Sequence, residues 1–434
     1  MEFKEALARL GIQKLNNLQE QALAAFPGGK DLLVLSPTGS GKTLCFLLPL
    51  IRLLAPEQAG VQALVLVPSR ELALQITDVF RSLQTGYKVA AFYGGHAVTT
   101  ETNTLREPPA LVIGTPGRIA FHFRECHINA QNLHTLVLDE FDKSLELGFR
   151  DEMAAIIASL PNLRQRFLTS ATAGSDIPAF AGFRSGHILN FLAASAVQPD
   201  LQYRLVSAAP EDKMEALYDL LCLIGREPVL VFVNHREMAV KVSEWLIDAA
   251  VPHGIFHGKL EQQERELNLA RFRNGSVRIL VTTDLAARGL DIPEVGAVVH
   301  YQMPVNREAF THRNGRTARM SASGTVYLVC TGAELPEWID VAAEPLERSS
   351  LPPLPPPEWE TVYASAGKKD KLSKTDLVGF FISKGGLSRE DIGLIEVKDQ
   401  MSFVAIKRNK VSKLLQSVGN EKIKNKRVRF EIAH

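Results

Sequence analysis

The chain has 434 residues, of which 46% are hydrophobic, and this is enough material for two or three globular domains with their own cores. No run approaches 18 apolar residues and the N-terminus has no apolar signal region, so we expect no membrane span and no secretion signal. The scattered cysteines form no Cys-x-x-Cys pair, so they suggest neither a zinc site nor a disulfide framework; reduced thiols and a cytoplasmic location follow as expectations.

The net charge of +1 hides an asymmetry along the chain. From Thr361 to the C-terminus there are 16 Lys and Arg against 8 Asp and Glu, which leaves 33 against 40 for the rest. A tail of +8 is therefore joined to a body of −7. Such a basic tail indicates a polyanion partner, although a merely solvated basic surface has the same composition.

The sequence S-P-T-G-S-G-K-T runs from Ser36 to Thr43, between a strand-like run at 32–35 and a helical pattern at 44–54. A strand, a Gly-rich turn and a helix in this order are typical of a phosphate-binding loop. Glycines let the backbone N–H groups point at phosphate oxygens, and the helix N-terminus adds positive charge. The predicted ATP contacts are Thr38, Gly39, Ser40, Gly41, Lys42 and Thr43, with Lys42 on the β- and γ-phosphates and Thr43 on Mg²⁺.

Apolar strand-like runs recur at 63–67, 89–93, 111–113, 135–138 and 166–168, mostly with helical patterns between them. This alternation predicts βαβ units and a mostly parallel sheet, which binds ligands at the carboxyl ends of its strands. Polar clusters follow those ends at 68–71, 94–95, 115–118 and 139–142.

The last of these clusters, Asp139-Glu140-Phe141-Asp142, follows a buried strand and suits a Mg²⁺ site. We expect Asp139 to hold the metal partly through water and Glu140 to polarise the attacking water. The alternative is a helix cap, which fits Asp142 but not the whole acidic set. Ser170-Ala171-Thr172 offers two hydroxyls to the same centre, although such a triplet also suits an ordinary turn.

A second α/β unit begins near residue 205, with strands expected at 229–233, 254–256, 278–281, 297–300 and 324–330. It has no phosphate loop, but it carries an arginine cluster from His312 to Arg319. Arginine supplied by another domain can stabilise charge on a transferring phosphoryl group. A solvated basic helix is the alternative interpretation of this cluster.

A proline-rich stretch from Leu351 to Pro357 predicts a stiff polyproline II linker, with a ligand for a proline-recognition domain as the alternative. Beyond it, the pattern predicts a βαββαβ domain: strands 361–364, 392–397, 402–406 and 427–432, with helices 374–383 and 411–418. Such a sheet can stack bases on Tyr363 and Phe403, but Phe403 also suits the core. The expected RNA contacts lie in the basic segments, at Lys407, Arg408, Lys424, Lys426 and Arg427.

Taken together, the motifs of residues 1 to 335 resemble those of the DEAD-box RNA helicases of superfamily 2. The resemblance implies two RecA-like domains that close on ATP and single-stranded RNA. It places Gln19 at the adenine and Asp291 at the ribose, and Arg316 and Arg319 at the phosphates as catalytic arginines beside Lys42 and Glu140. It also assigns five residues to contacts with the RNA backbone: Arg70, Gly95, Thr115, Arg118 and Thr283. On its own, Gln19 reads as an exposed side chain.

The sequence departs from the family pattern at three motifs. Phe141 replaces the alanine of the signature box, so its ring must find room. Leu15-Asn16-Asn17-Leu18 lacks the usual Pro-Thr-Pro before Gln19. Asn314 and Ala318 replace an apolar residue and a glycine in the arginine motif, whose basic positions are intact.

The tail resembles the C-terminal RNA-binding domain of the bacterial DEAD-box protein A group, through Gly367–Lys371, Asp376–Gly379 and Asp391–Gly393. In that group the domain grips a hairpin of large-subunit ribosomal RNA. The resemblance therefore implies a helicase of ribosome assembly.

The sequence thus predicts an α/β protein with a RecA-like ATP-binding domain at 1–204 and a second RecA-like domain at 205–345. A linker at 346–360 leads to an RRM-like RNA-binding domain at 361–434. We expect a monomeric, cytoplasmic, RNA-dependent ATPase that uses ATP and Mg²⁺ to separate short RNA duplexes locally. The alternatives are an ATP-gated RNA clamp with little unwinding and a DNA helicase.

Overall fold

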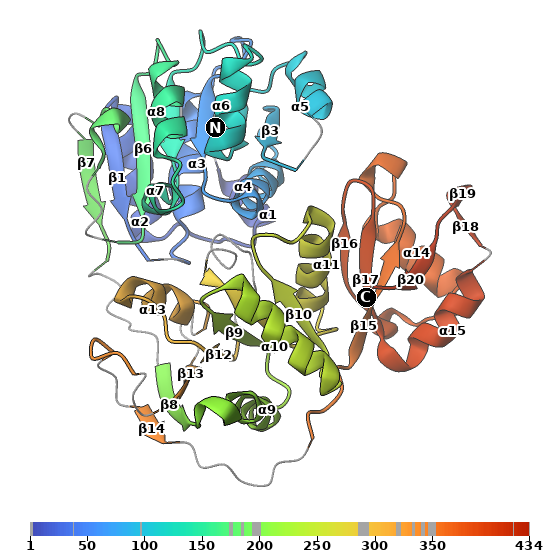
Figure 1. Cartoon of the computed structure of the whole chain (residues 1–434). Coiled ribbons are helices and arrows are strands. Elements are labelled where there is room, and N and C mark those ends of the chain that lie inside the picture. The colour runs from blue at the N-terminus through green and yellow to red at the C-terminus, as the bar shows by residue number, and fades with distance from the viewer. Residues whose placement is uncertain are drawn as a thin grey trace. The chain divides into compact units, whose positions relative to one another are not determined.

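The protein is described by a computed structural model (Figure 1) that covers residues 3–37, 39–95, 98–172, 177–183, 186–192, 201–284, 295–317, 323–331, 335–339, 343–345, 353–419 and 421–433. The chain divides into two compact units, one formed mainly by residues 1–198 and the other mainly by residues 199–434. Within the described residues, no helix is long and apolar enough to cross a membrane.

The first unit is built on a seven-stranded sheet with the order β3-β4-β2-β5-β6-β1-β7 and parallel pairing throughout. Apart from the edge strand β7, which is largely exposed, its strands are short and largely buried, as expected for strands covered on both faces. They are β1 (Asp31–Leu35), β2 (Ala63–Leu66), β3 (Val89–Phe92), β4 (Leu111–Gly114), β5 (Thr135–Leu138), β6 (Gln165–Ser170) and β7 (Gly186–Asn190).

Helices cover both faces of this sheet and divide its apolar side chains between two cores. Along β1, Leu32 and Val34 enter the core beneath α1 to α4, whereas Leu33 enters the core beneath α6, α7 and α8. The helices are α1 (Lys4–Arg9), α2 (Asn17–Ala25), α3 (Lys42–Leu53), α4 (Arg70–Ser82), α5 (Val98–Leu105), α6 (Pro116–Arg124), α7 (Phe141–Glu146) and α8 (Arg150–Ala158).

The second unit contains another seven-stranded parallel sheet, in the order β10-β11-β9-β12-β13-β8-β14. Its strands are β8 (Leu201–Ser207), β9 (Val229–Val233), β10 (His253–Phe256), β11 (Ile279–Thr283), β12 (Ala297–His300), β13 (Gly324–Cys330) and β14 (Ala343–Pro345). Its helices are α9 (Lys213–Ile224), α10 (Arg236–Asp248), α11 (Gln262–Arg273) and α13 (Arg307–Asn314). The prediction of two RecA-like parallel sheets is confirmed.

The tail folds as a four-stranded antiparallel sheet in the order β16-β17-β15-β20, with two helices. Its elements are β15 (Trp359–Ala364), α14 (Lys374–Ser383), β16 (Ile392–Val397), β17 (Ser402–Lys407), α15 (Arg408–Val418) and β20 (Phe430–Ile432). This confirms the βαββαβ order. The last strand is shorter than predicted, because a hairpin of β18 (Lys422–Ile423) and β19 (Lys426–Arg427) precedes it.

The two faces of the tail sheet have different neighbours within the second unit. Val362 and Val404 point into the core formed with α14 and α15. On the other face, the Thr361 hydroxyl bonds with Asn274 Oδ1 at 3.0 Å and Ser276 Oγ at 2.7 Å, just after α11. Phe403, on this same face, is buried. The contacts favour the core interpretation of Phe403 over a base-stacking platform.

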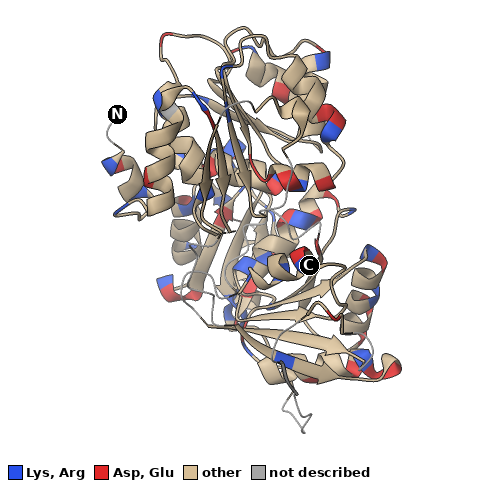
Figure 2. Ribbon diagram, turned by 90° about the vertical axis from the view of Figure 1, so that its left-hand side faces the viewer, with Lys and Arg blue, Asp and Glu red and all other residues tan. Residues whose placement is uncertain are grey.

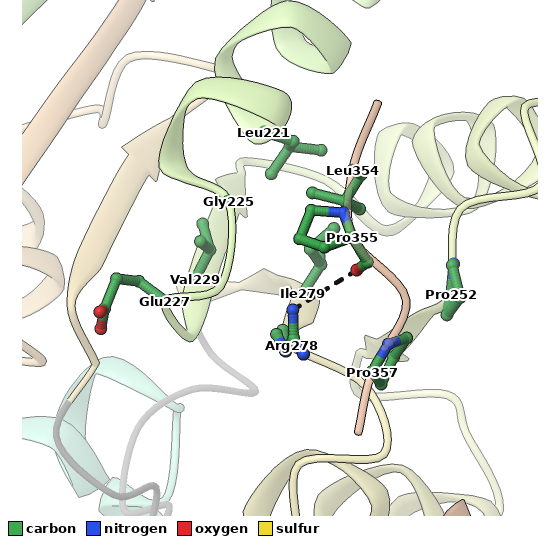
Figure 3. Close-up of a pocket in the computed structure, with 10 residues that line it drawn as sticks. All are labelled: Leu221, Gly225, Glu227, Val229, Pro252, Arg278, Ile279, Leu354, Pro355 and Pro357. Carbon is green, nitrogen blue, oxygen red and sulfur yellow. Dashed lines mark hydrogen bonds between the residues drawn. The ribbon is translucent and has the colours of Figure 1, made fainter. Parts of the chain in front are cut away.

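The described part of the linker, from residue 353 onward, lies against the second α/β domain (Figure 3). Leu354 packs on the apolar core of that domain, and the Arg278 guanidinium donates to the carbonyl oxygens of Pro355 at 3.4 Å and Pro356 at 3.2 Å. Arg408 of the tail donates its Nε–H to the Pro357 carbonyl at 2.9 Å. Proline carbonyls are good acceptors for this role because a polyproline segment satisfies none of them internally.

Candidate nucleotide and nucleic-acid site

The Gly-rich turn after β1 is shaped by a close approach from α2. Gly41 has φ +86°, and a Cβ there would lie 2.5 Å from Gln19 Nε2. The left-handed backbone favours glycine here, and a larger residue would also displace the Gln19 amide from its present position. The turn leads directly into α3, whose first backbone N–H groups have no partner within the helix and suit phosphate oxygens.

Lys42 is 8% exposed, and its ammonium is held at the mouth of this loop. Its Nζ donates to the carbonyl oxygens of Ser36 at 2.6 Å and Pro37 at 2.8 Å. Burial lowers the pKa of Lys42, while the charges of Glu140 and then the neighbouring carboxylates act in the opposite direction. The buried hydroxyl oxygens of Ser36 and Ser40 have no hydrogen-bond partner among the described atoms, so the loop has polar atoms to offer to phosphate.

The acidic cluster lies at the end of β5, two strands from β1 in the sheet. Asp139 is buried and accepts a hydrogen bond of 2.5 Å from the Thr169 hydroxyl, whose oxygen in turn accepts from the Glu140 N–H at 2.8 Å. Burial, and then the charge of Glu140, raise the pKa of Asp139 to about 7. A bound cation would favour the ionised form of this carboxyl.

Asp142 has a different role from the helix cap considered above. The N-cap of α7 is Glu140, which caps with no side-chain hydrogen bond and has φ +48°. Asp142 Oδ2 instead accepts from the Thr172 hydroxyl at 3.1 Å, so the predicted hydroxyl triplet does reach the acidic cluster. The other oxygen of Asp142 is buried without a described hydrogen-bond partner. The described residues contain no group of three or more His, Cys, Asp or Glu side chains that could hold a metal ion, so Mg²⁺ bound near Asp139 would also need oxygen ligands from the nucleotide or water.

Gln19 is 5% exposed, so its interpretation as a surface side chain was wrong. It forms a capping box with Asn16 at the start of α2, and its Nε2 donates to the Gly41 carbonyl at 3.3 Å. Asn16 Nδ2 donates to the Ser40 carbonyl at 3.0 Å. The sequence did not single out Asn16, which ties α2 to the phosphate loop although the usual Pro-Thr-Pro is missing.

Phe141 finds its room in the core. The ring is 1% exposed and packs in the apolar cluster that also contains Leu138 and Leu168. The replacement of alanine therefore adds core packing beside the acidic cluster, and it leaves the Asp139 and Glu140 carboxyls in place.

The residues predicted to contact RNA in the first unit gather at the carboxyl ends of β2, β3 and β4. A Cβ on Gly95 would lie 2.6 Å from an Nη atom of Arg70, so the two are in contact. The Thr115 N–H donates to the carbonyl of Phe92, and Arg118 Nε donates to the carbonyl of Tyr93 at 3.3 Å. Three separate loops thus form one continuous edge.

In the second unit, the arginine motif contains a buried member that the sequence did not distinguish. Arg313 is 1% exposed and donates to both oxygens of Asp284, at 2.6 and 2.7 Å, and to Asn234 Oδ1 at 2.7 Å. Arg316 and Thr283 are also buried. Three residues of the predicted site, Thr38, Asp291 and Arg319, lie outside the described residues.

The departure at Asn314 is explained by a buried polar pair. His300 Nε2 donates to Asn314 Oδ1 at 2.8 Å, and His300 Nδ1 lies 3.3 Å from Arg313 Nη1. Burial, and then the Arg313 charge, lower the pKa of His300 to about 3. An apolar residue at 314 would leave the imidazole N–H without this acceptor.

Comparison with known proteins accounts for all three parts of the chain. The DEAD/DEAH box helicase family matches residues 16–180, the helicase conserved C-terminal domain matches 212–321, and the DbpA RNA binding domain matches 361–432. The chain is 32% identical to the ATP-dependent RNA helicase DbpA of Escherichia coli, over 98% of this chain and 96% of that protein. It is 29% identical to the protein of the same name from Bacillus subtilis, over 99% and 97%. The chain belongs to the DEAD-box RNA helicases.

Solved structures of DEAD-box helicases agree with this placement. Saccharomyces cerevisiae Dbp5 bound to RNA and ADP BeF3 matches with a TM-score of 0.69 and 25% identity, over 79% of this chain and 93% of that one. Mss116 bound to ssRNA and UDP-BeF matches with a TM-score of 0.70 and 25% identity, over 80% and 78%. As a DEAD-box helicase, the protein is an RNA-dependent ATPase with helicase activity that binds a nucleotide and RNA.

We predict that Phe141→Ala, which restores the family's usual alanine, destabilises the first unit by about 3–5 kcal/mol because it leaves a cavity in a closed core. Turnover should not rise. Thermal denaturation and steady-state ATP hydrolysis measure the two effects, with partly buried Phe180→Ala as the control. A variant that is as stable as the wild type and hydrolyses ATP faster would contradict this interpretation.

The depressed pKa of His300 predicts a loss of stability in acid. His300 takes up a proton near pH 6.5 in the unfolded state but only near pH 3 in the folded state. Its contribution to the free energy of unfolding is therefore complete above pH 6.5 and declines as the pH falls from 6.5 towards 3. At pH 5 the loss is about 2 kcal/mol. Denaturant titrations from pH 7.5 to pH 5 measure how the free energy of unfolding depends on pH. We expect this dependence to be weaker than in the wild type for His300→Gln and the same as in the wild type for the exposed His187→Gln.

Proposed function

We propose that this protein is an ATP-dependent RNA helicase directed to large-subunit ribosomal RNA, where it separates short duplexes locally during ribosome assembly. The observation that carries the proposal is the joining of an intact phosphate loop and acidic cluster to a basic tail of the DbpA RNA-binding type. The proposed setting is the cytoplasm and the proposed working form is a monomer.

The roles that we propose in ATP hydrolysis follow from the chemistry of the first unit. The loop from Thr38 to Thr43 cradles the phosphates, with Lys42 leaving its two carbonyl acceptors for phosphate oxygens. Thr43 and Asp139 would hold Mg²⁺, which supplies charge neutralisation on the phosphates. Glu140 orients the attacking water, and Gln19 contacts the adenine. Arg316 and Arg319, with Asp291 at the ribose, complete the proposed set from the second unit.

The RNA contacts that we propose for the α/β domains are Arg70, Gly95, Thr115, Arg118 and Thr283. The first four form one edge of the first unit, where guanidinium groups and backbone N–H groups suit phosphate oxygens. Contacts to the RNA backbone carry no sequence information, so the α/β domains should bind RNA irrespective of sequence and lose affinity as salt rises.

Recognition of a particular RNA then falls to the tail, and the structure favours its hairpin over its sheet face. The sheet face is covered by contacts with the α11 end, as described above. The hairpin turns at Lys424 and Asn425, which both have positive φ, as a tight two-residue turn requires. Lys424, Lys426 and Arg427 are our proposed RNA contacts at this turn. Figure 2 shows that basic and acidic residues are mixed along the ribbon.

The hairpin lysines are held by acidic neighbours that RNA phosphates can replace. Lys424 Nζ lies 2.6 Å from Asp376 and lowers the pKa of that carboxyl to about 2, while Lys426 pairs with Asp370. Both lysine side chains are about half exposed, so these pairs are screened and weak. Lys407 and Arg408 remain predicted RNA contacts; Arg408 also holds the linker through the Pro357 carbonyl.

We predict that ribosomal RNA stimulates ATP hydrolysis more strongly than generic RNA or single-stranded DNA does, and that Glu140→Gln abolishes the stimulated rate in every case. Steady-state hydrolysis with each nucleic acid, with RNA binding measured in parallel, tests this. Tight RNA binding with negligible hydrolysis by the wild type would favour the ATP-gated clamp. Equal stimulation by DNA would favour the DNA helicase.

We also predict that Lys424→Gln, Lys426→Gln and Arg427→Gln together remove the preference for ribosomal RNA and leave stimulation by generic RNA unchanged. Removal of phosphate contacts should also make binding of the ribosomal fragment less dependent on salt. The matched control replaces three exposed basic residues elsewhere in the tail, Lys374, Lys384 and Arg389, with glutamine. If both triple variants lose the preference equally, overall charge and not the hairpin determines it.

A further inference from the structure

A buried carboxylate lies behind the RNA edge of the first unit, outside the nucleotide site. Glu101, on α5, is 4% exposed. Its Oε2 forms an ion pair with the Arg118 guanidinium, whose Nε lies 3.0 Å away, and accepts from His122 Nε2 at 2.7 Å; its Oε1 accepts from the Tyr93 N–H at 3.3 Å. These donors belong to α6 and to the segment after β3, so one side chain joins three parts of the chain.

The protons of this cluster follow from its geometry. His122 is completely buried and donates its Nε2–H to the carboxylate. Its Nδ1 lies 3.1 Å from His127 Nδ1, so a single proton lies between those two nitrogens. The charged and titratable groups around Glu101 are thus Arg118, His122 and, beyond it, His127. A buried carboxylate is tolerated because these donors compensate its lost hydration.

The cluster also fixes the path of the Gly94-Gly95 loop. Tyr93, the residue before the loop, donates its N–H to Glu101, and its carbonyl accepts from Arg118 Nε at 3.3 Å. The backbone N–H and carbonyl of Tyr93 are therefore both held by the ion pair of Glu101 and Arg118. Gly95 is in turn in contact with Arg70.

We propose that Glu101 is a positioning residue for RNA binding: it orients the Arg118 guanidinium and, through Tyr93, the Gly94-Gly95 loop, so that this edge is ordered before RNA arrives. His122 assists by fixing the carboxylate. A side chain that is already ordered loses less conformational freedom on binding, so the carboxylate strengthens RNA binding without touching RNA. This inference rests on the proposed function, which assigns Arg118 and Gly95 to RNA.

The test compares full-length Glu101→Ala with the wild type, and uses an unstructured single-stranded RNA as the probe. We expect the RNA concentration for half-maximal ATPase stimulation to rise about tenfold, the gain expected of a charge-assisted hydrogen bond. The KM for ATP and the unstimulated rate should stay unchanged. Glu107→Ala, on a 92% exposed side chain that follows the same helix, is the matched control.

A double-mutant cycle separates positioning from a general structural role. Glu101→Ala should weaken RNA binding less in the Arg118→Ala background than in the wild type, because the route through Arg118 is already lost there and only the route through the Tyr93 N–H remains. Glu101→Gln keeps the shape and an acceptor for the Tyr93 N–H, so it should restore part of the RNA affinity, and it serves as the readout if the alanine variant fails to fold. Additive effects, or an equal rise in the KM for ATP, would overturn the inference.

The same experiment distinguishes this inference from the proposed function. A wild type that RNA neither stimulates nor binds would overturn both. A wild type that RNA stimulates, beside a Glu101→Ala variant with unchanged half-saturation, would overturn only the role of Glu101.

Discussion

Buried charge is the constraint on which the working parts of this molecule depend. Lys42, Asp139, Glu101 and Arg313 are all withdrawn from water, and each is held by specific partners: carbonyls, a hydroxyl, or an opposite charge. Removing an ion from water costs several kcal/mol unless such partners replace its hydration. The partners therefore fix the orientation of each group, and the apolar sheet that buries the charges also positions the chemistry.

In the tail, polar and charged side chains are likewise held by specific partners, here on one face of the antiparallel sheet. Thr361 and Glu396 lie on the sheet face that packs beside α11, where Arg273 pairs with Glu396 at 3.3 Å. A polar contact surface of this kind is specific in register and leaves the sheet without an open stacking face. The hairpin between α15 and β20 then supplies an exposed basic turn, to which we assign the proposed RNA contacts of the tail.

Much of the fold could be predicted from the sequence, because apolar periodicity and the phosphate-loop pattern are local signals. The helix at 374–383 and the strand at 392–397 were placed as the structure has them. The burial of Gln19, the pairing of Arg313 with Asp284 and the contact of Thr361 with Asn274 were not found, since each depends on residues far apart in the chain. The hairpin was missed because its strands are only two residues long and carry no alternating pattern.

The first sheet also joins the two halves of the proposed chemistry. The nucleotide residues follow β1, β5 and β6, and the RNA candidates follow β2, β3 and β4. The halves meet where β2 pairs with β5: Leu66 lies beside Leu138, and the Asp139 N–H donates to the Leu66 carbonyl at 3.0 Å. Four residues after Leu66 comes Arg70, in contact with Gly95. In the proposed mechanism ATP and RNA favour the same state, so each would strengthen the other's binding by the same factor, and the hydrogen-bonded pair of β2 and β5 directly connects the two sets of proposed residues.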